Sequence, residues 1–237
     1  MAAGYRWLFF DLFDTLCTVD ETVYYEGKRK AAALVAVDEQ RFLAVWGGTS
    51  PDASVGKLRT PIDRAVRALE ALGIQDRALA MEVAQLDVEF IQRCVVYYDG
   101  AVQALEALRA RGFKLGLISN ATATTAFAVG PMRLRSHLDQ LVFSYEVGLV
   151  KPDPAIFHAA LRKAACPPGG ALFIGDGANG ELDAAVAVGM AALCMDHPVK
   201  ALSFRNPATL SSSSHPKVHS FGELLALPEL QSPLADA

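Results

Sequence analysis

Short uninterrupted apolar runs alternate with helical patterns along most of this chain, and polar residues follow each run at a turn. Apolar runs of about four to eight residues bounded by turn signals are typical of strands that are buried on both faces. Their alternation with amphipathic helices favours a parallel sheet with crossover helices. We therefore expect an α/β fold with a doubly wound, Rossmann-like parallel sheet. The expected strands are 7–11, 114–120, 141–144, 171–176 and 191–195.

The segment from residue 18 to residue 98 interrupts this alternation, because it offers only helical patterns where one crossover helix would suffice. We expect it to be an all-helical cap inserted into the α/β core, which then comprises residues 1–17 and 99–237. The helical patterns of the cap lie at 22–37, 38–46, 61–73 and 76–98, with a loop rich in Gly, Ser and Pro at 47–60.

Composition narrows the class of protein. A chain of 237 residues that is 52% hydrophobic and 20% charged can bury a sizeable core, which excludes a disordered chain. The net charge of -4 and the lack of a basic stretch predict no nucleic-acid partner. The uncharged apolar run 184–195 is shorter than the roughly 20 residues that span a bilayer, so we expect no membrane role. Four scattered cysteines without a C-x-x-C pair predict a reduced, cytoplasmic protein.

Acidic and polar residues stand at the ends of three expected strands. Asp11 ends the first strand, Ser119 and Asn120 end the second, and Asp176 ends the strand at 171–176. Because ligands collect beyond the carboxyl ends of parallel strands, we expect these side chains to converge. Further polar or turn residues beside the same strand ends are Thr15, Lys151, Gly177 and Glu181.

Four ordered motifs carry a resemblance to a known family: DLFDTL at 11–16, LISNA at 117–121, VKPDPAIF at 150–157 and IGDGANGE at 174–181. Together they resemble the motifs of the haloacid dehalogenase superfamily of hydrolases. The resemblance extends over nearly the whole chain, and it implies a cap that is inserted after the first motif and closes over the strand ends. It also implies a small-molecule substrate, and we expect a monomer or a homodimer.

The resemblance implies a catalytic role for three residues. Asp11 would be the nucleophile, because a carboxylate at a strand end can attack phosphorus or carbon and form an aspartyl ester. Ser119 and Lys151 would stabilise the charge on the transferred group. The residues expected to contact the substrate are Asn120, Thr15 and Gly177.

A Mg²⁺ site is the cofactor site that the resemblance implies. Mg²⁺ prefers carboxylate, carbonyl and water oxygens in octahedral geometry. The expected ligands are the carboxylates of Asp11, Asp176 and Glu181 and the backbone carbonyl of Phe13.

Phe13 is a departure from the phosphatases of this superfamily, which carry a second Asp two residues after the nucleophile to protonate the leaving group. In the dehalogenases of the superfamily this position is aromatic, since a halide leaves without a proton. Asp14 follows directly, but in an extended segment its side chain points to the other side. A turn would be needed for Asp14 to replace the missing acid.

The acid at position 176 argues in the opposite direction, because the dehalogenases need no metal and lack an equivalent of Asp176. They also carry a halide-binding arginine in the cap, and neither Arg41 nor Arg59 has the expected neighbours. We therefore favour a Mg²⁺-dependent phosphatase that acts on a small phosphate monoester. Two alternatives stay open, a 2-haloacid dehalogenase and a catalytically blunted binding protein. In the cap, Tyr24, Tyr25 and Trp46 could line the substrate pocket, although such residues more often belong to a core. Replacing Trp46 or Arg59 is expected to change the ranking of substrates if the cap faces the strand ends.

Overall fold

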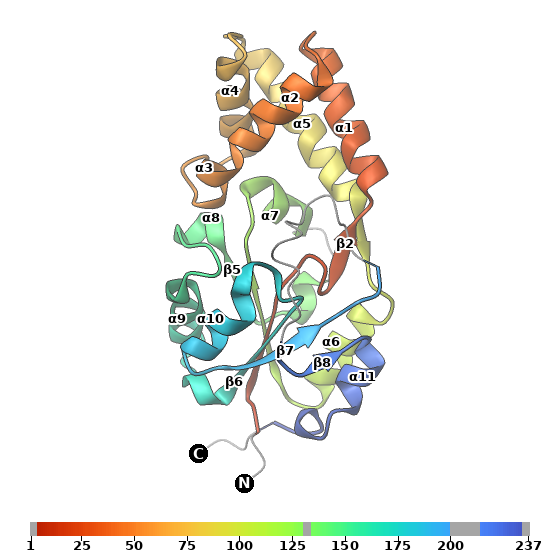
Figure 1. The fold of residues 1–237 in the computed structure, drawn as a ribbon, viewed down its shortest axis with the longest axis vertical. Helices are drawn as coiled ribbons and strands as arrows, with labels where there is room; N and C mark the ends of the chain where they lie inside the picture. Colours follow the sequence, from red (N-terminus) through yellow and green to blue (C-terminus); the bar gives the residue numbers. More distant parts are fainter. Residues whose placement is uncertain (1–3, 130–133, 200–213, 234–237) are drawn as a thin grey trace.

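The computed structural model describes residues 4–129, 134–199 and 214–233. The core contains a six-stranded parallel sheet with the strand order β5-β4-β1-β6-β7-β8. In Figure 1 this sheet lies below a group of helices. The strand order runs outward from β1 in both directions, so the sheet is doubly wound as predicted. The strands are β1 (Trp7–Phe10), β4 (Lys114–Ser119), β5 (Gln140–Phe143), β6 (Ala171–Gly175), β7 (Ala191–Met195) and β8 (Lys217–Val218).

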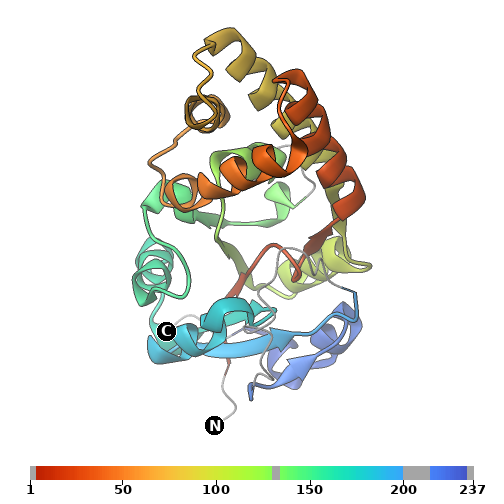
Figure 2. The same cartoon turned by 45° about the horizontal axis from the view of Figure 1, so that its top comes forward.

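Helices cover both faces of this sheet (Figures 1 and 2). On one face α6 (Ala101–Ala110) and α11 (Phe221–Ala226) pack against Leu8 and Phe10. On the other face α9 (Pro154–Lys163) and α10 (Glu181–Ala187) pack against Phe9. Successive side chains of a strand point to opposite faces, so the run at β1 is buried on both sides. Shorter elements are α7 (Ala123–Val129), α8 (Ser144–Val147) and the 3₁₀ turns Arg135–His137, Pro168–Gly170, Ala178–Gly180 and Pro228–Leu230.

The cap lies beyond the carboxyl ends of the strands, at the top of Figure 1. It has an apolar core of its own, which includes Phe42, Trp46 and Leu69. Four cap helices begin at an Asp or Thr whose side chain accepts a hydrogen bond from the backbone N–H three residues on, as N-caps do. The helices of the cap, of which all but α3 have such an N-cap, are α1 (Glu21–Leu34), α2 (Glu39–Gly48), α3 (Ser50–Ser54), α4 (Pro61–Ala71) and α5 (Arg77–Cys94).

Two short strands connect the cap to the core, so the insertion is not all-helical. β2 (Cys17–Val19) and β3 (Val95–Tyr97) pair in antiparallel orientation. The helical pattern predicted at 76–98 therefore ends at Cys94, because the β-branched and aromatic residues that follow favour an extended backbone. The boundaries between cap and core at 17/18 and 98/99 stay a prediction.

Other differences from the prediction concern short elements. The segment 47–60, predicted as a loop, contains α3, which has Pro51 in its first turn. β8 and α11 follow the last predicted strand and extend the sheet by one short edge strand.

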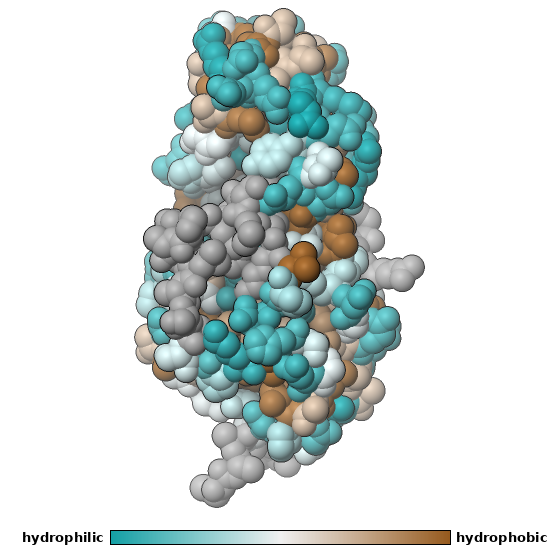
Figure 3. Space-filling model, turned by 45° about the vertical axis from the view of Figure 1, so that its right-hand side comes forward, coloured by the Kyte–Doolittle hydropathy of each residue, from teal (hydrophilic) through white to brown (hydrophobic). Residues whose placement is uncertain are grey.

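The surface drawn in Figure 3 is mainly hydrophilic over the cap, and its hydrophobic residues form small groups separated by hydrophilic ones. Within the described ranges, no helix combines the length and the hydropathy that crossing a lipid bilayer requires.

Candidate active site

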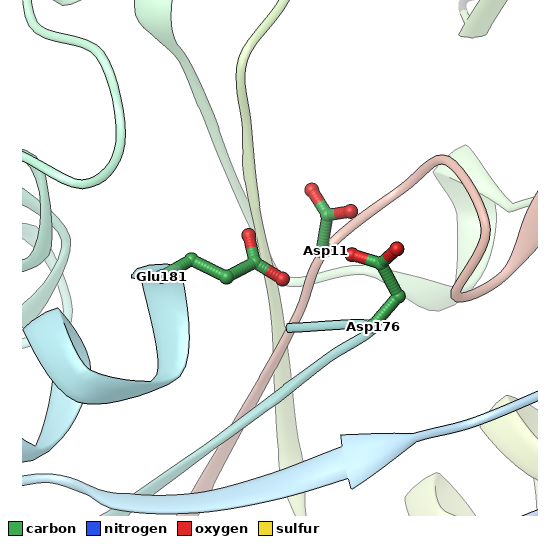
Figure 4. A group of neighbouring side chains, drawn as sticks. All are labelled: Asp11, Asp176 and Glu181. Carbon is green, nitrogen blue, oxygen red and sulfur yellow. The ribbon is translucent and has the colours of Figure 1, made fainter. Parts of the chain in front are cut away.

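Asp11, Asp176 and Glu181 bring their carboxylates together at the carboxyl end of the sheet, where the three side chains point toward one another (Figure 4). One oxygen from each carboxylate lies within 4.8 Å of the others. β1 and β6 are neighbours, with Phe10 opposite Ile174, so the residues that follow these strands lie side by side. The convergence expected from the strand ends is therefore present in the fold.

Lys151 lies between two of these carboxylates. Its Nζ donates to Asp11 Oδ1 and, at 2.6 Å, to Glu181 Oε2. Burial by itself would lower the pKa of Lys151, but the Asp11 and Glu181 charges outweigh it and raise this pKa. The side chain of Lys151 is only 3% exposed, so the ammonium is withdrawn from water and held as a cation by its partners.

The negative charge of the buried Glu181 carboxylate is only partly compensated by its surroundings. Burial raises its pKa to about 7, an effect that Lys151 opposes and Asp11 reinforces. Its Oε1 is buried and has no hydrogen-bond partner among the residues that the structure describes. Gly175 provides the room for this atom, since a Cβ at position 175 would collide with it.

The donor set fits a divalent metal ion. Lys151 compensates part of the negative charge of the three clustered carboxylates, and among the described residues no second cation is paired with Asp11 or Glu181. A buried group of carboxylates is costly without further positive charge. Glu181 Oε1 offers an unused oxygen, and oxygen donors of this kind suit Mg²⁺. The carbonyl of Phe13 as a further ligand stays a prediction.

Ser119 is the last residue of β4 and Asn120 follows it, and both line the cavity above the carboxylates. Asn120 also holds the Lys151 segment in place: its Nδ2 donates to the Lys151 carbonyl at 2.9 Å, and its Oδ1 accepts from the Lys151 N–H at 2.7 Å. Asn120 therefore helps to direct Lys151 toward Asp11, a contact that its position in the sequence did not reveal.

The turn that follows Asp11 places the side chain of Asp14 beside the strands β2 and β3, which connect the cap to the core. Asp14 has a left-handed backbone (φ 57°), and its Oδ1 accepts hydrogen bonds from Thr18 Oγ1 at 2.9 Å and from the Tyr98 hydroxyl at 3.1 Å. Phe13 lines the cavity and also packs against the core. Thr15, predicted to contact the substrate, is fully buried beneath this turn.

A cavity of ≈ 350 Å³ connects the carboxylate cluster to the cap. Neither Thr15 nor Gly177 is among its lining residues. Burial raises the pKa of Tyr24, which lines the cavity, so this hydroxyl stays protonated at neutral pH. The lining residues contributed by the cap are Val19, Tyr24, Ser50, Arg64, Asp87 and Ile91, and three threonines, Thr122, Thr124 and Thr125, lie at or just before α7.

Three cap residues considered for this pocket, Tyr25, Trp46 and Arg59, are not among its lining residues. Trp46 is buried in the apolar core of the cap, where its ring stacks on Phe42, and Arg59 is exposed. Arg64 and Asp87 line the pocket instead. Arg64 was not predicted from the sequence. A signal for it exists, since Arg64 lies on the same face of α4 as the buried apolar residues of that helix.

Comparisons with known proteins give the same assignment as the motifs. A family model described as haloacid dehalogenase-like hydrolase matches residues 5–189. The human haloacid dehalogenase-like hydrolase domain-containing protein 3 is 35% identical over 131 residues, which cover 54% of this chain and 52% of that protein. The chain thus spans about half the length of this relative. The glyceraldehyde 3-phosphate phosphatase of Methanothermobacter thermautotrophicus is 26% identical over 80% of this chain and 84% of that protein.

Two solved structures show the same fold. The 2-haloacid dehalogenase of Pseudomonas syringae has a TM-score of 0.73 and 23% identity, with 95% of this chain and 97% of that chain covered. A HAD-family enzyme of Bacteroides thetaiotaomicron, in complex with magnesium and inorganic phosphate, has a TM-score of 0.63 and 20% identity, with 81% and 94% covered.

Proposed function

Since this chain belongs to the haloacid dehalogenase-like hydrolase family, we propose that it is a Mg²⁺-dependent phosphatase that hydrolyses a small phosphate monoester. The observation that carries the proposal is the buried cluster of Asp11, Asp176 and Glu181, whose carboxylate oxygens lie within 4.8 Å of one another. A halide displacement by Asp11 alone would need no such cluster. The phosphatase among the relatives supports the same choice.

Asp11 is the proposed nucleophile. Its carboxylate forms a bond to phosphorus while the ester oxygen leaves, and water then attacks the aspartyl phosphate to release inorganic phosphate and restore the carboxylate. Lys151 and Ser119 lie where they can donate to the phosphoryl oxygens, because both line the same cavity as Asp11. Asn120 keeps Lys151 in position through two hydrogen bonds to its backbone.

Asp11, Asp176 and Glu181 would hold the metal ion, with Phe13 contributing its carbonyl. When bound, Mg²⁺ neutralises charge on the carboxylates and on the phosphoryl group. No disulfide joins the four cysteines, which are all buried, and this supports the further proposal of a cytoplasmic location.

The test measures phosphate and halide release in the same wells, from a panel of phosphate monoesters and 2-haloacids, with Mg²⁺ and with a chelator. We expect phosphate release that requires Mg²⁺, and no halide. Asp11→Asn should lower kcat more than about tenfold, since an amide is a poor nucleophile. Asp183→Asn is the matched control, because this Asp lies in α10 but its side chain is 82% exposed.

Two other outcomes would replace the proposal. Halide release that persists in the chelator would identify a dehalogenase. A folded protein that releases neither product from any compound would favour the catalytically blunted binding protein.

A further inference from the structure

Three charged residues lie buried in the cap, Lys28 of α1, Arg64 of α4 and Asp87 of α5. Arg64 and Asp87 line the cavity, and Lys28 contacts Asp87. Lys28 Nζ donates to Asp87 Oδ1, and both side chains are 5% exposed or less. These two residues therefore form a neutral pair. Because Lys28 and Asp87 neutralise each other, the cluster of three residues keeps one net positive charge, which we assign to Arg64.

Arg64 is held by uncharged groups. Its Nε donates to Thr49 Oγ1 at 2.9 Å, and its Nη2 donates to Ser50 Oγ at 3.0 Å and to the Trp46 carbonyl at 3.3 Å. The guanidinium also stacks on the Trp46 ring, 4.5 Å from its centroid. No ion pair to Arg64 within 4.0 Å is present in the described ranges. The charge of Asp87 acts on Arg64 as well, but Asp87 is paired with Lys28. The fold thus positions the guanidinium rigidly and leaves Arg64 and Lys28 to share the carboxylate of Asp87.

The location of Arg64 relates it to the reaction. Arg64 lines the same ≈ 350 Å³ cavity as Asp11, Ser119 and Lys151, but from the opposite, cap side. A phosphoryl group bound beside Asp11 would direct its leaving group toward the cap. A buried cation is costly unless an anion or good hydrogen bonds accompany it, and a planar guanidinium suits a carboxylate with two parallel hydrogen bonds.

We propose that Arg64 binds a carboxylate on the leaving group, so that the preferred substrates are small phosphate monoesters that also carry a carboxylate. The inference rests on the proposed phosphatase function. One uncompensated positive charge matches one carboxylate, whereas a second phosphate would bring about two negative charges next to Asp87. The volume of the cavity favours a compact leaving group.

The experiment compares acids with their uncharged amides, which have nearly the same shape. The pairs are phosphoglycolate with phosphoglycolamide, and 4-carboxyphenyl phosphate with 4-carbamoylphenyl phosphate. With Mg²⁺ present, we expect kcat/KM of the wild type to favour the acid by about tenfold or more in at least one pair, as a charge-assisted hydrogen bond would give. The preference should appear mainly in KM.

Variants of Arg64 test whether this residue causes the preference. Arg64→Gln should reduce the ratio of kcat/KM for the acid to kcat/KM for the amide to about one. Arg64→Lys should keep part of the preference, because the positive charge stays but the planar guanidinium with its two parallel donors is lost. Arg67→Gln is the matched control, since Arg67 lies on the same helix with its side chain 56% exposed. Circular dichroism verifies that each variant is folded. The ratio measured for the wild type tests the proposal even if a variant does not fold.

The outcomes separate the two proposals. Equal kcat/KM for acid and amide in both pairs, with phosphate released from all four compounds, would overturn the role of Arg64 and leave the phosphatase standing. If ethylene glycol bisphosphate were hydrolysed better than phosphoglycolate, Arg64 would bind a second phosphate and the proposed carboxylate would be wrong. No phosphate from any compound would overturn the phosphatase and the role of Arg64 together.

Discussion

Phe13 leaves the candidate site without a proton donor at the position where related phosphatases carry one. Its ring lines the cavity two residues after Asp11. Asp14 is a poor substitute, because Thr18 and Tyr98 both donate hydrogen bonds to its Oδ1 and hold its side chain in place. At the scale of single residues, the site can form an aspartyl ester more readily than it can protonate a poor leaving group.

We therefore expect the wild type to hydrolyse aryl phosphates about 10²- to 10⁴-fold faster than alkyl phosphates, since a phenolate leaves without a proton and a placed acid contributes about that factor. Phe13→Asp should raise alkyl phosphate turnover and narrow the gap. The measurement is kcat for phenyl and ethyl phosphate in each variant.

Asp14→Asn serves as the comparison for this prediction and should leave the gap between aryl and alkyl phosphates unchanged. Equal turnover of the two esters by the wild type, together with its loss in Asp14→Asn, would show instead that Asp14 supplies the proton.

Among the helices, the contact between α1 and α5 depends on Gly27. A Cβ at position 27 would lie 2.5 Å from both Cβ and Cγ of Phe90, atoms too near the α5 backbone to move aside. Gly47 in α2 is the opposite case, because a Cβ there would meet no atom within 4 Å. Two glycines in helices of the same cap thus have different reasons to be present.

We expect Gly27→Ala to lower the free energy of unfolding by about 1–3 kcal/mol through overpacking. Gly47→Ala should raise it by about 0.5–1 kcal/mol, because alanine loses less backbone entropy in a helix. Urea unfolding followed by circular dichroism measures both. A Gly27→Ala protein as stable as the wild type would mean that α1 and α5 can separate at no cost.

The helices and strands also show what a single sequence can predict. The runs at β1 and β6 are buried on both faces, and such strands need an uninterrupted apolar sequence that is visible without a structure. The ribbon of β2 and β3 has only three residues per strand, and its pairing joins residues nearly eighty positions apart, so no local pattern marks it. Arg64 was missed for a related reason: whether a charged residue on a helix faces solvent or a cavity depends on packing with other helices.

At the scale of the whole molecule, the cavity has opposite charges at its two ends. Asp11, Asp176 and Glu181 give the core end an excess of negative charge, while Arg64 gives the cap end a positive one. A bound cation at the core end would therefore stabilise the folded protein as well as take part in catalysis. This stabilisation depends on pH through Glu181.

The last prediction follows from the pKa of Glu181, which is raised from an ordinary value of 4.5 to about 7. A raised folded-state pKa gives a stability contribution that is fully present below the unfolded value and is lost as pH rises through about 7. Without metal, the free energy of unfolding should therefore fall between about pH 5 and about pH 8, by roughly 1–3 kcal/mol from this group. Mg²⁺ binds the ionised carboxylate, so its stabilising effect should be larger at the higher pH.

Thermal unfolding in chelator and in Mg²⁺ at both pH values measures these two effects. The residue at position 181 cannot ionise in Glu181→Gln, so the metal-free stability of this variant should change less with pH than that of the wild type. Subtracting one pH profile from the other removes the contribution of all other groups. Glu82→Gln, an exposed change on α5, should behave like the wild type. If Glu181→Gln kept the full pH dependence and Mg²⁺ stabilised the wild type equally at both pH values, Glu181 would be neither the titrating group nor a metal ligand.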